Sequence, residues 1–227
     1  MRDSVRITGW RRGWTPALAG LAAAAGMAVA PHEAMAQRAS AIVILDGSNS
    51  MNARLPNDKA LKFVTVRDAL RTTLPKLTPG TEVGLAAFGA RRVNDCSDAE
   101  VIAPPAADFA PVLGALDRFQ PRGFSPVVLS LRLAAKSLPP TASKASLVLV
   151  IDDLASCRGE DPCAVAGELK KQNPALAIHV VGLGLRPSDA EVLSCMVRQT
   201  SRRADLRCSK VSSSPPSVRR TKPARSA

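Results

Sequence analysis

The segment that most constrains this chain is AIVILDGSNSM at residues 41–51. Five consecutive apolar residues lead directly into Asp46, and a short uninterrupted apolar run of this kind is typical of a strand buried on both faces. Such strands belong to parallel sheets covered by helices, where ligands bind just beyond the carboxyl ends of the strands. Asp46, Ser48 and Ser50 therefore place a carboxylate and two hydroxyls at a typical binding position. These are hard oxygen ligands, which suit Mg²⁺ or Mn²⁺.

The rest of the chain alternates between strand-like and helix-like segments. Further strands are predicted at residues 82–89, 100–103 (a short edge strand), 146–151 and 176–185, and helices at 57–74, 108–119, 126–138, 162–173 and 188–197. Capping residues support the helix starts: Asn57 or Asp58, Asp108, Asp161 before Pro162, and a capping box of Ser188 and Glu191. This alternation predicts an α/β fold with a Rossmann-like, mostly parallel central sheet and helices on both faces.

Residues 1–36 have the features of a secretory signal peptide. Four arginines form its basic region: Arg2, Arg6, Arg11 and Arg12. An alanine-rich apolar stretch follows at residues 16–30, and Ala34-Met35-Ala36 supplies small residues for cleavage before Gln37. The apolar stretch is shorter than the roughly 20 residues needed to span a membrane. We therefore expect cleavage after Ala36, a periplasmic or secreted location and no membrane anchor in the mature protein.

Most of the positive charge lies near the C-terminus. The formal net charge is +12, and nine of the Lys and Arg residues fall within residues 197–227, against one acidic residue, Asp205. From Ser212 onward the chain consists mostly of Ser, Pro, Arg and Lys, a composition that is typical of disordered segments. We therefore divide the mature chain into a folded domain at residues 37–208, which is nearly neutral up to residue 196, and a basic tail at residues 209–227.

The cysteine content favours disulfides. An exported protein with five cysteines is expected to form them, and a zinc site is disfavoured because the chain has no CxxC motif and only one histidine after residue 36. Cys157 and Cys163 are close enough in sequence to pair across a short loop. The pairing of Cys96, Cys195 and Cys208 is left open, and the odd number leaves one cysteine over.

The Asp-x-Ser-x-Ser pattern at Asp46 resembles the first motif of the metal-ion-dependent adhesion site of von Willebrand factor type A domains. In that family a second ligand comes from the threonine of a Gly-x-Thr-Pro turn, and Gly123-Phe124-Ser125-Pro126 stands at that place with serine for threonine. The third is an aspartate that ends the next central strand, which Asp152 matches after SLVLVI. Taken alone, Ser125 is also typical of a helix N-cap.

The resemblance covers about residues 40–196. The segments DCSDAEV at 95–101, SCRGEDPCAVA at 156–166 and IHVVGLGL at 178–185 resemble a bacterial exported subgroup of these domains. Three departures stand out. Asn49 replaces a usual glycine, and asparagine tolerates positive φ. Asp153 replaces the glycine after the third-motif aspartate, which adds a carboxylate. Residues 201–203, Ser-Arg-Arg, stand where the subgroup has glycines and an aromatic residue, which leaves a final strand open.

The resemblance implies that Mg²⁺ or Mn²⁺ is held by five side chains: Asp46, Ser48, Ser50, Ser125 and Asp152. Two carboxylates roughly neutralise a divalent cation and leave octahedral positions to water. An Asp or Glu carboxylate of a protein partner would displace that water. The implied function is metal-bridged protein binding without catalysis.

Two other functions are compatible with the sequence. The basic tail could bind anionic lipid or envelope polymer electrostatically, with the domain as a scaffold, while export argues against nucleic acid. A metal-dependent hydrolase is the other alternative. However, haloacid-dehalogenase-type phosphatases need a second aspartate where this chain has Ser48. Ser-His-Asp hydrolysis needs a histidine, and only His179 remains, which we expect to be buried in a strand. We therefore predict that the chain is not an enzyme.

Overall fold

The computed structural model describes residues 38–55, 59–154, 157 and 159–201. The predicted signal peptide, the predicted cap at Asn57 and Asp58, Cys208 and the basic tail lie outside the described residues. Within the described part of the chain, no helix is both long enough and apolar enough to cross a membrane.

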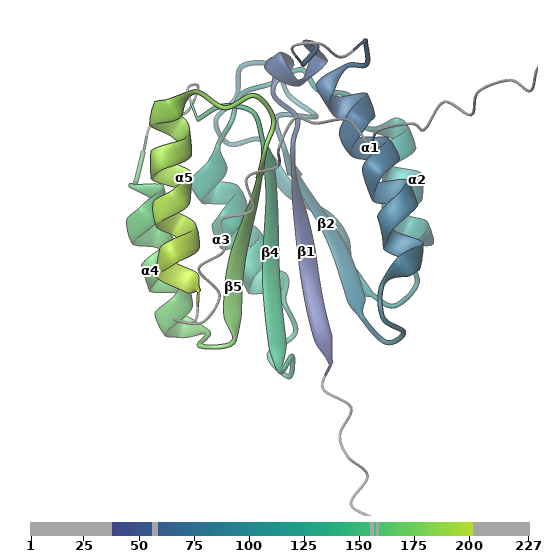
Figure 1. The fold of residues 1–227 in the computed structure, drawn as a ribbon, viewed down its shortest axis with the longest axis vertical. Helices are drawn as coiled ribbons and strands as arrows, with labels where there is room; N and C mark the ends of the chain where they lie inside the picture. The colour runs from purple at the N-terminus through teal and green to yellow at the C-terminus, as the bar shows by residue number, and fades with distance from the viewer. Residues whose placement is uncertain (1–37, 56–58, 155–156, 158, 202–227) are drawn as a thin grey trace, which may run out of the picture. The chain divides into compact units, whose positions relative to one another are not determined.

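A five-stranded sheet forms the centre of the fold, with the strand order β3-β2-β1-β4-β5 (Figure 1). The strands are β1 (Ala39–Asp46), β2 (Glu82–Phe88), β3 (Ala99–Ala106), β4 (Lys144–Ile151) and β5 (Leu176–Gly182). Strand β1 pairs in parallel with β2 and β4, and β5 pairs in parallel with β4. Only β3, paired with β2 at the edge, is antiparallel among the described strands. The predicted α/β class with a mostly parallel sheet is confirmed.

Helices cover both faces of the sheet (Figure 1). The helices are α1 (Lys62–Thr73), α2 (Ala110–Arg118), α3 (Val127–Ser137), α4 (Pro162–Gln172) and α5 (Pro187–Thr200), with short 3₁₀ turns η1 (Asn49–Asn52) and η2 (Leu74–Lys76). One apolar core joins the sheet to α3, α4 and α5, and a second core joins its other face to α1 and α2.

The two cores explain the uninterrupted apolar run in β1. Successive side chains of a strand point to opposite faces, so Ile42 and Ile44 pack in the α3–α4–α5 core, while Val43 and Leu45 pack in the α1–α2 core. All four are at most 5% exposed. The central position of β1 fixes its carboxyl end, and with it Asp46, between two flanking parallel strands.

Several predicted element boundaries differ from the structure. Helix α1 begins at Lys62, after Leu61, and not near Asn57 or Asp58. Strand β3 is longer than residues 100–103 and includes Pro104 and Pro105. Proline is tolerated there because an edge strand has a side with no ladder partner.

The predicted cap at Asp161 is confirmed: Asp161 is the N-cap of α4, and its Oδ1 accepts a hydrogen bond from Cys163 N (3.0 Å). The N-cap of α2 is Phe109 and not Asp108, although Asp108 Oδ1 accepts a hydrogen bond from Ala110 N (2.9 Å), at the start of that helix. The predicted capping box of Ser188 and Glu191 is wrong. Helix α5 starts earlier, after Arg186, which has no side-chain cap bond.

Two further predictions, the burial of His179 and the cysteine pairing, are wrong. His179 is exposed and not buried, because it lies on the edge strand β5. The predicted pairing of Cys157 with Cys163 is wrong: Cys96 bonds to Cys157 and Cys163 to Cys195, with Cα–Cα distances of 5.7 and 5.6 Å. Cys163 lies in the first turn of α4, where it reaches α5, whereas Cys157 precedes that helix and reaches the β2–β3 loop.

Candidate functional site

Two buried aspartates end up side by side at the carboxyl edge of the sheet. Asp46 ends β1, and Asp152 directly follows β4, the strand paired with β1; the residues are 0% and 4% exposed. Asp46 Oδ1 accepts a hydrogen bond from Ser48 N (2.7 Å), and its Oδ2 accepts a long one from Asp152 N (3.3 Å). Adjacent parallel strands thus bring the two carboxylates together although they are far apart in sequence.

The two serines of the first motif connect to the second aspartate through their hydroxyls. Ser48 Oγ lies 2.9 Å from Ser50 Oγ, and Ser50 Oγ donates to Asp152 Oδ1 (2.8 Å). Ser48 is 4% exposed and Ser50 is half-buried. Four of the five residues singled out in the sequence are therefore linked in one cluster, which we call the Asp46–Asp152 cluster: Asp46, Ser48, Ser50 and Asp152.

Ser125, the fifth residue, lies in the neighbouring loop before α3. Its loop is held against the first motif by backbone contacts: Asn49 N donates to Gly123 O (3.1 Å), and Gly123 N donates to Gly47 O (3.1 Å). Ser125 is 1% exposed and directly precedes Pro126, the residue before the first turn of α3. The second motif is thus positioned beside the first by a short parallel bridge between Ser48 and Gly123.

Glycines allow these loops to approach so closely. A Cβ added at Gly123 would lie 2.6 Å from Gly89 Cα, closer than real side chains come. Gly89, which follows β2, has a φ of 65°, a conformation that side-chain-bearing residues rarely adopt. The β2–β3 loop and the Ser125 loop therefore meet only because both carry glycine at the contact.

The sequence analysis missed Lys62, the first residue of α1. Its Nζ lies 2.7 Å from Asp152 Oδ2, and the two side chains are 14% and 1% exposed. The signal becomes visible only once the helix start is known: a lysine in the first turn of a helix is unfavourable for the helix dipole, which prefers acidic side chains there. Such a residue is expected to have a nearby anionic partner.

Burial dominates the electrostatics of the cluster. Desolvation, with a smaller contribution from the charge of Asp152, raises the pKa of Asp46 to about 7 against the opposing effect of the hydrogen bonds from Ser48. The ammonium of Lys62 contacts Asp152, and a further cation placed beside Asp46 would favour the ionised form of that carboxylate.

The carboxylate and hydroxyl oxygens of this site together fit a hard divalent cation. In the described part of the chain no three His, Cys, Asp or Glu residues are grouped so that they could hold a metal, so a site here has to draw on hydroxyls. The Asp46–Asp152 cluster offers two carboxylates and two hydroxyls in mutual contact, with the buried Ser125 hydroxyl in the adjoining loop. All are oxygen ligands of the type that Mg²⁺ and Mn²⁺ prefer.

Asp153, which replaces the usual glycine of the family after Asp152, does not enlarge the Asp46–Asp152 cluster. Asp153 is half-buried, and its described electrostatic effect is on the β5–α5 side. The pKa of the Arg186 guanidinium is raised mainly by hydrogen bonds to Asp189, with a small contribution from the charge of Asp153.

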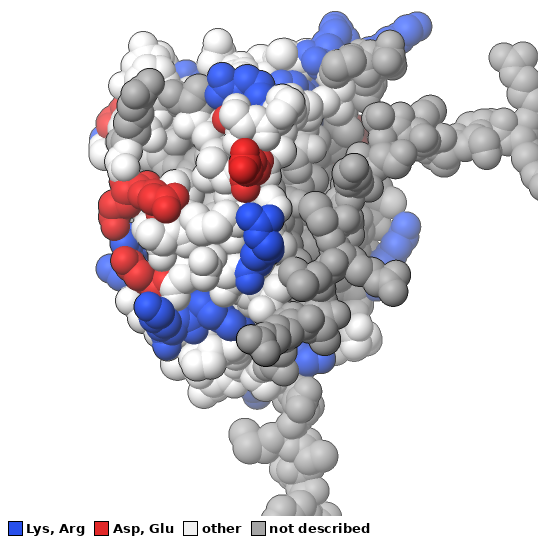
Figure 2. All heavy atoms as spheres, turned by 60° about the vertical axis from the view of Figure 1, so that its left-hand side comes forward, with Lys and Arg blue, Asp and Glu red and all other residues white. Residues whose placement is uncertain are grey.

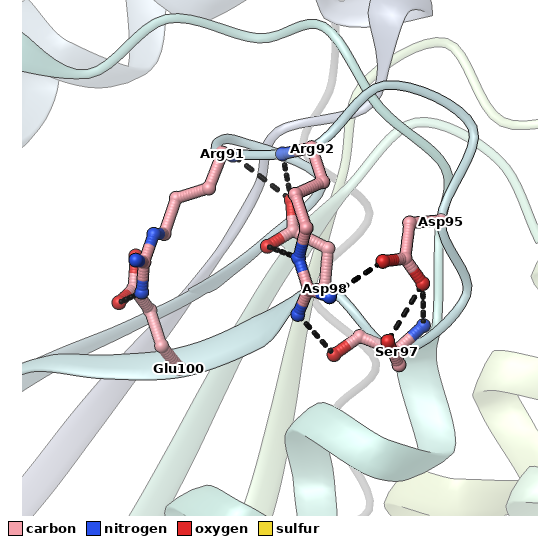
Figure 3. Close-up of polar contacts among 6 residues, drawn as sticks. All are labelled: Arg91, Arg92, Asp95, Ser97, Asp98 and Glu100. Carbon is pink, nitrogen blue, oxygen red and sulfur yellow. Dashed lines mark hydrogen bonds and ion pairs between the residues drawn. The ribbon is translucent and has the colours of Figure 1, made fainter.

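The β2–β3 loop next to the cluster contains another buried carboxylate, which the sequence analysis did not single out (Figure 3). Asp98 Oδ2 accepts hydrogen bonds from the backbone N–H groups of Arg91 (2.9 Å) and Arg92 (2.8 Å), and its side chain is 4% exposed. Asp98 O also accepts from Gly89 N (2.9 Å). Asp98 thus closes the turn that begins at Gly89.

The rest of this loop is braced by exposed pairs (Figure 3). Arg92 Nη1 lies 2.7 Å from Asp95 Oδ2, and Asp95 Oδ1 accepts from both the backbone N and the hydroxyl of Ser97 (2.7 Å each). These bonds from Ser97 lower the pKa of Asp95. Together with the Cys96–Cys157 disulfide, they fix the β2–β3 loop against the segment that follows Asp152.

A groove of about 780 Å³ opens beside Ser125. Its lining includes the start of α3, the Cys96–Cys157 disulfide, and Asp161 and Asp189 near the starts of α4 and α5. On the α4–α5 side of the domain, acidic and basic side chains are intermixed, with uncharged surface between them (Figure 2). Arg132, for example, pairs with Glu160 and Glu168. The groove is therefore not part of a surface with a single sign of charge.

Comparison with known proteins agrees with this architecture. The sequence profile of the von Willebrand factor type A domain matches residues 41–155, half of the chain. A search of the curated proteins gave no match.

Solved structures show the same fold at low sequence identity. An aerotolerance-related membrane protein from Bacteroides fragilis is 15% identical, with a TM-score of 0.56, covering 71% of this chain and 88% of that one. The conserved hypothetical protein BatB from Bacteroides thetaiotaomicron is 13% identical (TM-score 0.55, 71% and 86% covered). The VWA domain of SpRpn10 is 18% identical (TM-score 0.54, 74% and 84% covered). With the profile match, the sheet order and the motif positions, the chain belongs to the von Willebrand factor type A domain family.

Proposed function

We propose that this chain is a binding module that captures a protein partner through a divalent cation at the carboxyl edge of its sheet. The ion, Mg²⁺ or Mn²⁺, would be held by Asp46, Ser48, Ser50, Ser125 and Asp152. The observation that carries this proposal is the hydrogen-bonded chain from Ser48 through Ser50 to Asp152, beside the buried Asp46. It brings oxygen donors from separate loops to one point.

The chemistry of these donors suits capture of an acidic ligand. Two carboxylates balance the charge of a divalent ion, while neutral hydroxyls leave it electrophilic. A bound ion would supply an attraction for an incoming Asp or Glu carboxylate of the partner. The chain's own residues would hold the ion and leave a coordination position to water, which the partner's carboxylate would replace, and no covalent bond would be made or broken. Von Willebrand factor type A domains are commonly used for protein interaction, and we propose no catalytic activity for this one.

The proposed location is the periplasm or the cell exterior. Residues 1–36 have the pattern of a signal peptide, and the two disulfides of the domain are of the kind that persist in oxidising compartments. N-terminal sequencing of the protein recovered from the periplasm would test this directly. The expected first residue is Gln37.

Calorimetric titration with Mg²⁺ and Mn²⁺ tests the proposed site. Chelator-stripped protein is expected to bind about one equivalent of metal, and Asp46→Ala and Ser48→Ala are each expected to abolish this binding. Asp95→Ala, in the neighbouring loop and partly exposed, is the matched control and should bind as the unaltered protein does. No binding at millimolar metal by the unaltered protein would refute the metal-bridged function.

The basic tail is the second candidate, because residues 209–227 contain five Lys and Arg residues and no acidic residue. In this case anionic lipid or envelope polymer would bind electrostatically. Such binding weakens steeply with salt and survives chelation, whereas metal-bridged binding responds in the opposite way. Co-sedimentation with anionic vesicles, with and without residues 209–227, separates the two mechanisms.

A further inference from the structure

We propose that Lys62 is a built-in counter-ion of the Asp46–Asp152 cluster, and that a divalent cation binds by displacing its ammonium from Asp152. The inference deepens the proposed function and rests on it, because displacement requires a metal that binds at this cluster. The observation behind it is the buried contact between Lys62 Nζ and Asp152 Oδ2, at 2.7 Å.

The ion pair is too well buried to be an incidental surface contact. The side chains of Lys62 and Asp152 are 14% and 1% exposed. Exposed pairs contribute little to stability, whereas removing one partner of a buried pair leaves an uncompensated charge and is strongly destabilising. Lys62 therefore has a direct role in holding Asp152 in its place in the metal-free protein.

The hydrogen bonds show which position the ammonium takes. Asp152 Oδ1 is occupied by the hydroxyl of Ser50, and Asp152 Oδ2 by Lys62. Asp46, by contrast, accepts from two backbone N–H groups. Among the ion pairs of the described residues, Lys62 with Asp152 is the one that reaches either carboxylate of the cluster. Lys62 thus supplies positive charge at a place where the metal would supply it.

An ammonium and a divalent ion are poorly compatible in this space. Together they would put three positive charges against two carboxylates in a largely buried site, where charges of like sign repel strongly. Lysine has a flexible stem of four carbons, and Lys62 is attached at the very start of α1, at the edge of the cluster. The side chain can therefore leave for solvent without moving the sheet.

This arrangement predicts opposite effects of Lys62 on stability and on metal affinity. Without metal, the ammonium keeps the two carboxylates together and the loops assembled. With metal, it is a competitor, so the affinity of the intact protein is lower than that of its five oxygen ligands alone. A partner would then meet a preassembled site whose metal occupancy depends on the local Mg²⁺ or Mn²⁺ concentration.

The test compares Lys62→Met, which keeps the length of the stem and removes the charge, with Lys62→Arg, which keeps a charge. Lys59→Met, at an exposed lysine of the same segment, is the matched control. Thermal denaturation in EDTA and calorimetric titration with Mg²⁺ are measured on each purified protein. We expect Lys62→Met to melt about 5 °C lower in EDTA, and to bind Mg²⁺ about tenfold tighter than the unaltered protein. Lys62→Arg should bind no more tightly, and Lys59→Met should change neither property.

Each outcome separates this inference from the proposed function. Tighter binding by Lys62→Met supports the inference, and it does so even if the unaltered protein binds no metal, a result that would refute the metal-bridged function alone. Metal binding that is equal or weaker in Lys62→Met overturns the inference and leaves the function intact. Absence of binding in both proteins overturns both. If Lys62→Met is unfolded in EDTA, refolding on addition of millimolar Mg²⁺ supports the inference, and failure to refold overturns it.

Discussion

Two groups of buried carboxylates lie close together in this domain: Asp98 alone in the β2–β3 loop, and Asp46 with Asp152 at the carboxyl edge of the sheet. Their negative charges are compensated in different ways. Asp98 accepts two backbone N–H groups at Oδ2, and Arg92 Nε lies 3.9 Å from its Oδ1. Asp46 and Asp152 instead lie next to each other, and the ammonium of Lys62 contacts Asp152. The first group is a closed unit within one loop, whereas the second assembles residues from β1, β4 and α1.

The difference indicates which group is structural and which is available to a ligand. A lone carboxylate that accepts two backbone N–H groups and has an arginine nearby stabilises the turn that surrounds it. Two carboxylates at one point repel each other, and burial raises the pKa of Asp46 to about 7. Such a cluster is maintained at a cost in stability, which is common where a protein binds or reacts.

The largest effect on stability is expected from the disulfide that connects the two groups. Cys96 and Cys157 are 61 residues apart, and a cross-link of that span stabilises the fold by about 4 kcal/mol in the chain-entropy model. We expect Cys96→Ser with Cys157→Ser to lower the free energy of unfolding by about that amount in urea denaturation, and to weaken Mg²⁺ binding because the loop after Asp152 is no longer held.

The second disulfide is the control for this experiment. Cys163 and Cys195 are 32 residues apart and join α4 to α5, away from both carboxylate groups. Replacing both with serine should lower the free energy of unfolding by nearly as much, again about 4 kcal/mol. It should leave metal binding unchanged. Equal weakening of metal binding in the two variants would contradict the assignment of Cys96–Cys157 to the site.

Asp98→Ala is expected to have the next largest effect. The change leaves the backbone N–H groups of Arg91 and Arg92 without their buried acceptor, which lowers the free energy of unfolding by about 2–3 kcal/mol. Urea denaturation in EDTA measures it. Asp95→Ala, in the same loop but partly exposed, should lower it by less than about 1 kcal/mol. Similar losses in the two variants would show that Asp98 does not hold the loop.

Gly123→Ala tests how the second motif is positioned against the first. The added Cβ would meet Gly89 Cα at 2.6 Å, so the loop that carries Ser125 must move. We expect a loss of about 1–2 kcal/mol in the free energy of unfolding and a clear drop in Mg²⁺ affinity by calorimetry. Gly159→Ala is the control, because a Cβ there has no neighbour within 4 Å. Unaltered metal affinity in Gly123→Ala would exclude Ser125 from the donor set.

The fold could be predicted from sequence because its signals are local and repeated. The doubly buried β1 has an apolar residue at every position from 41 to 45, and the strands and helices then alternate in order. The start of a helix was predicted less accurately where the only signal was a single polar residue. Ser188 looks like a cap, but Arg186 and Asp189 form an ion pair at the start of α5, and the helix begins earlier.

The candidate site was predictable only as far as its residues stand in family motifs. Asp46, Ser48 and Ser50 lie in one segment, and Ser125 and Asp152 were singled out because they match the second and third motifs of the family. Lys62 could not be placed, because its contact depends on where α1 begins, and the predicted start was several residues too early. The cysteine pairing failed for a similar reason. Proximity in sequence favoured Cys157 with Cys163, whereas the direction in which each residue faces decides the bond.

The smallest effect on stability is expected from replacing a buried aspartate by asparagine. This change tests directly how the charge of each carboxylate is compensated. Asp46→Asn removes a charge that burial disfavours but keeps an acceptor for Ser48 N, so in EDTA near pH 8 its free energy of unfolding should stay within about 1 kcal/mol of the unaltered value. Asp98→Asn removes a charge that Arg92 and two N–H groups stabilise, and should lower it by about 1–2 kcal/mol. Urea denaturation of the two variants measures the difference, and calorimetry should show Mg²⁺ binding lost only in Asp46→Asn. An equal loss of stability in both would mean that the Asp46 carboxylate is as well compensated as that of Asp98. In that case the cluster would have no unbalanced charge for a metal to neutralise.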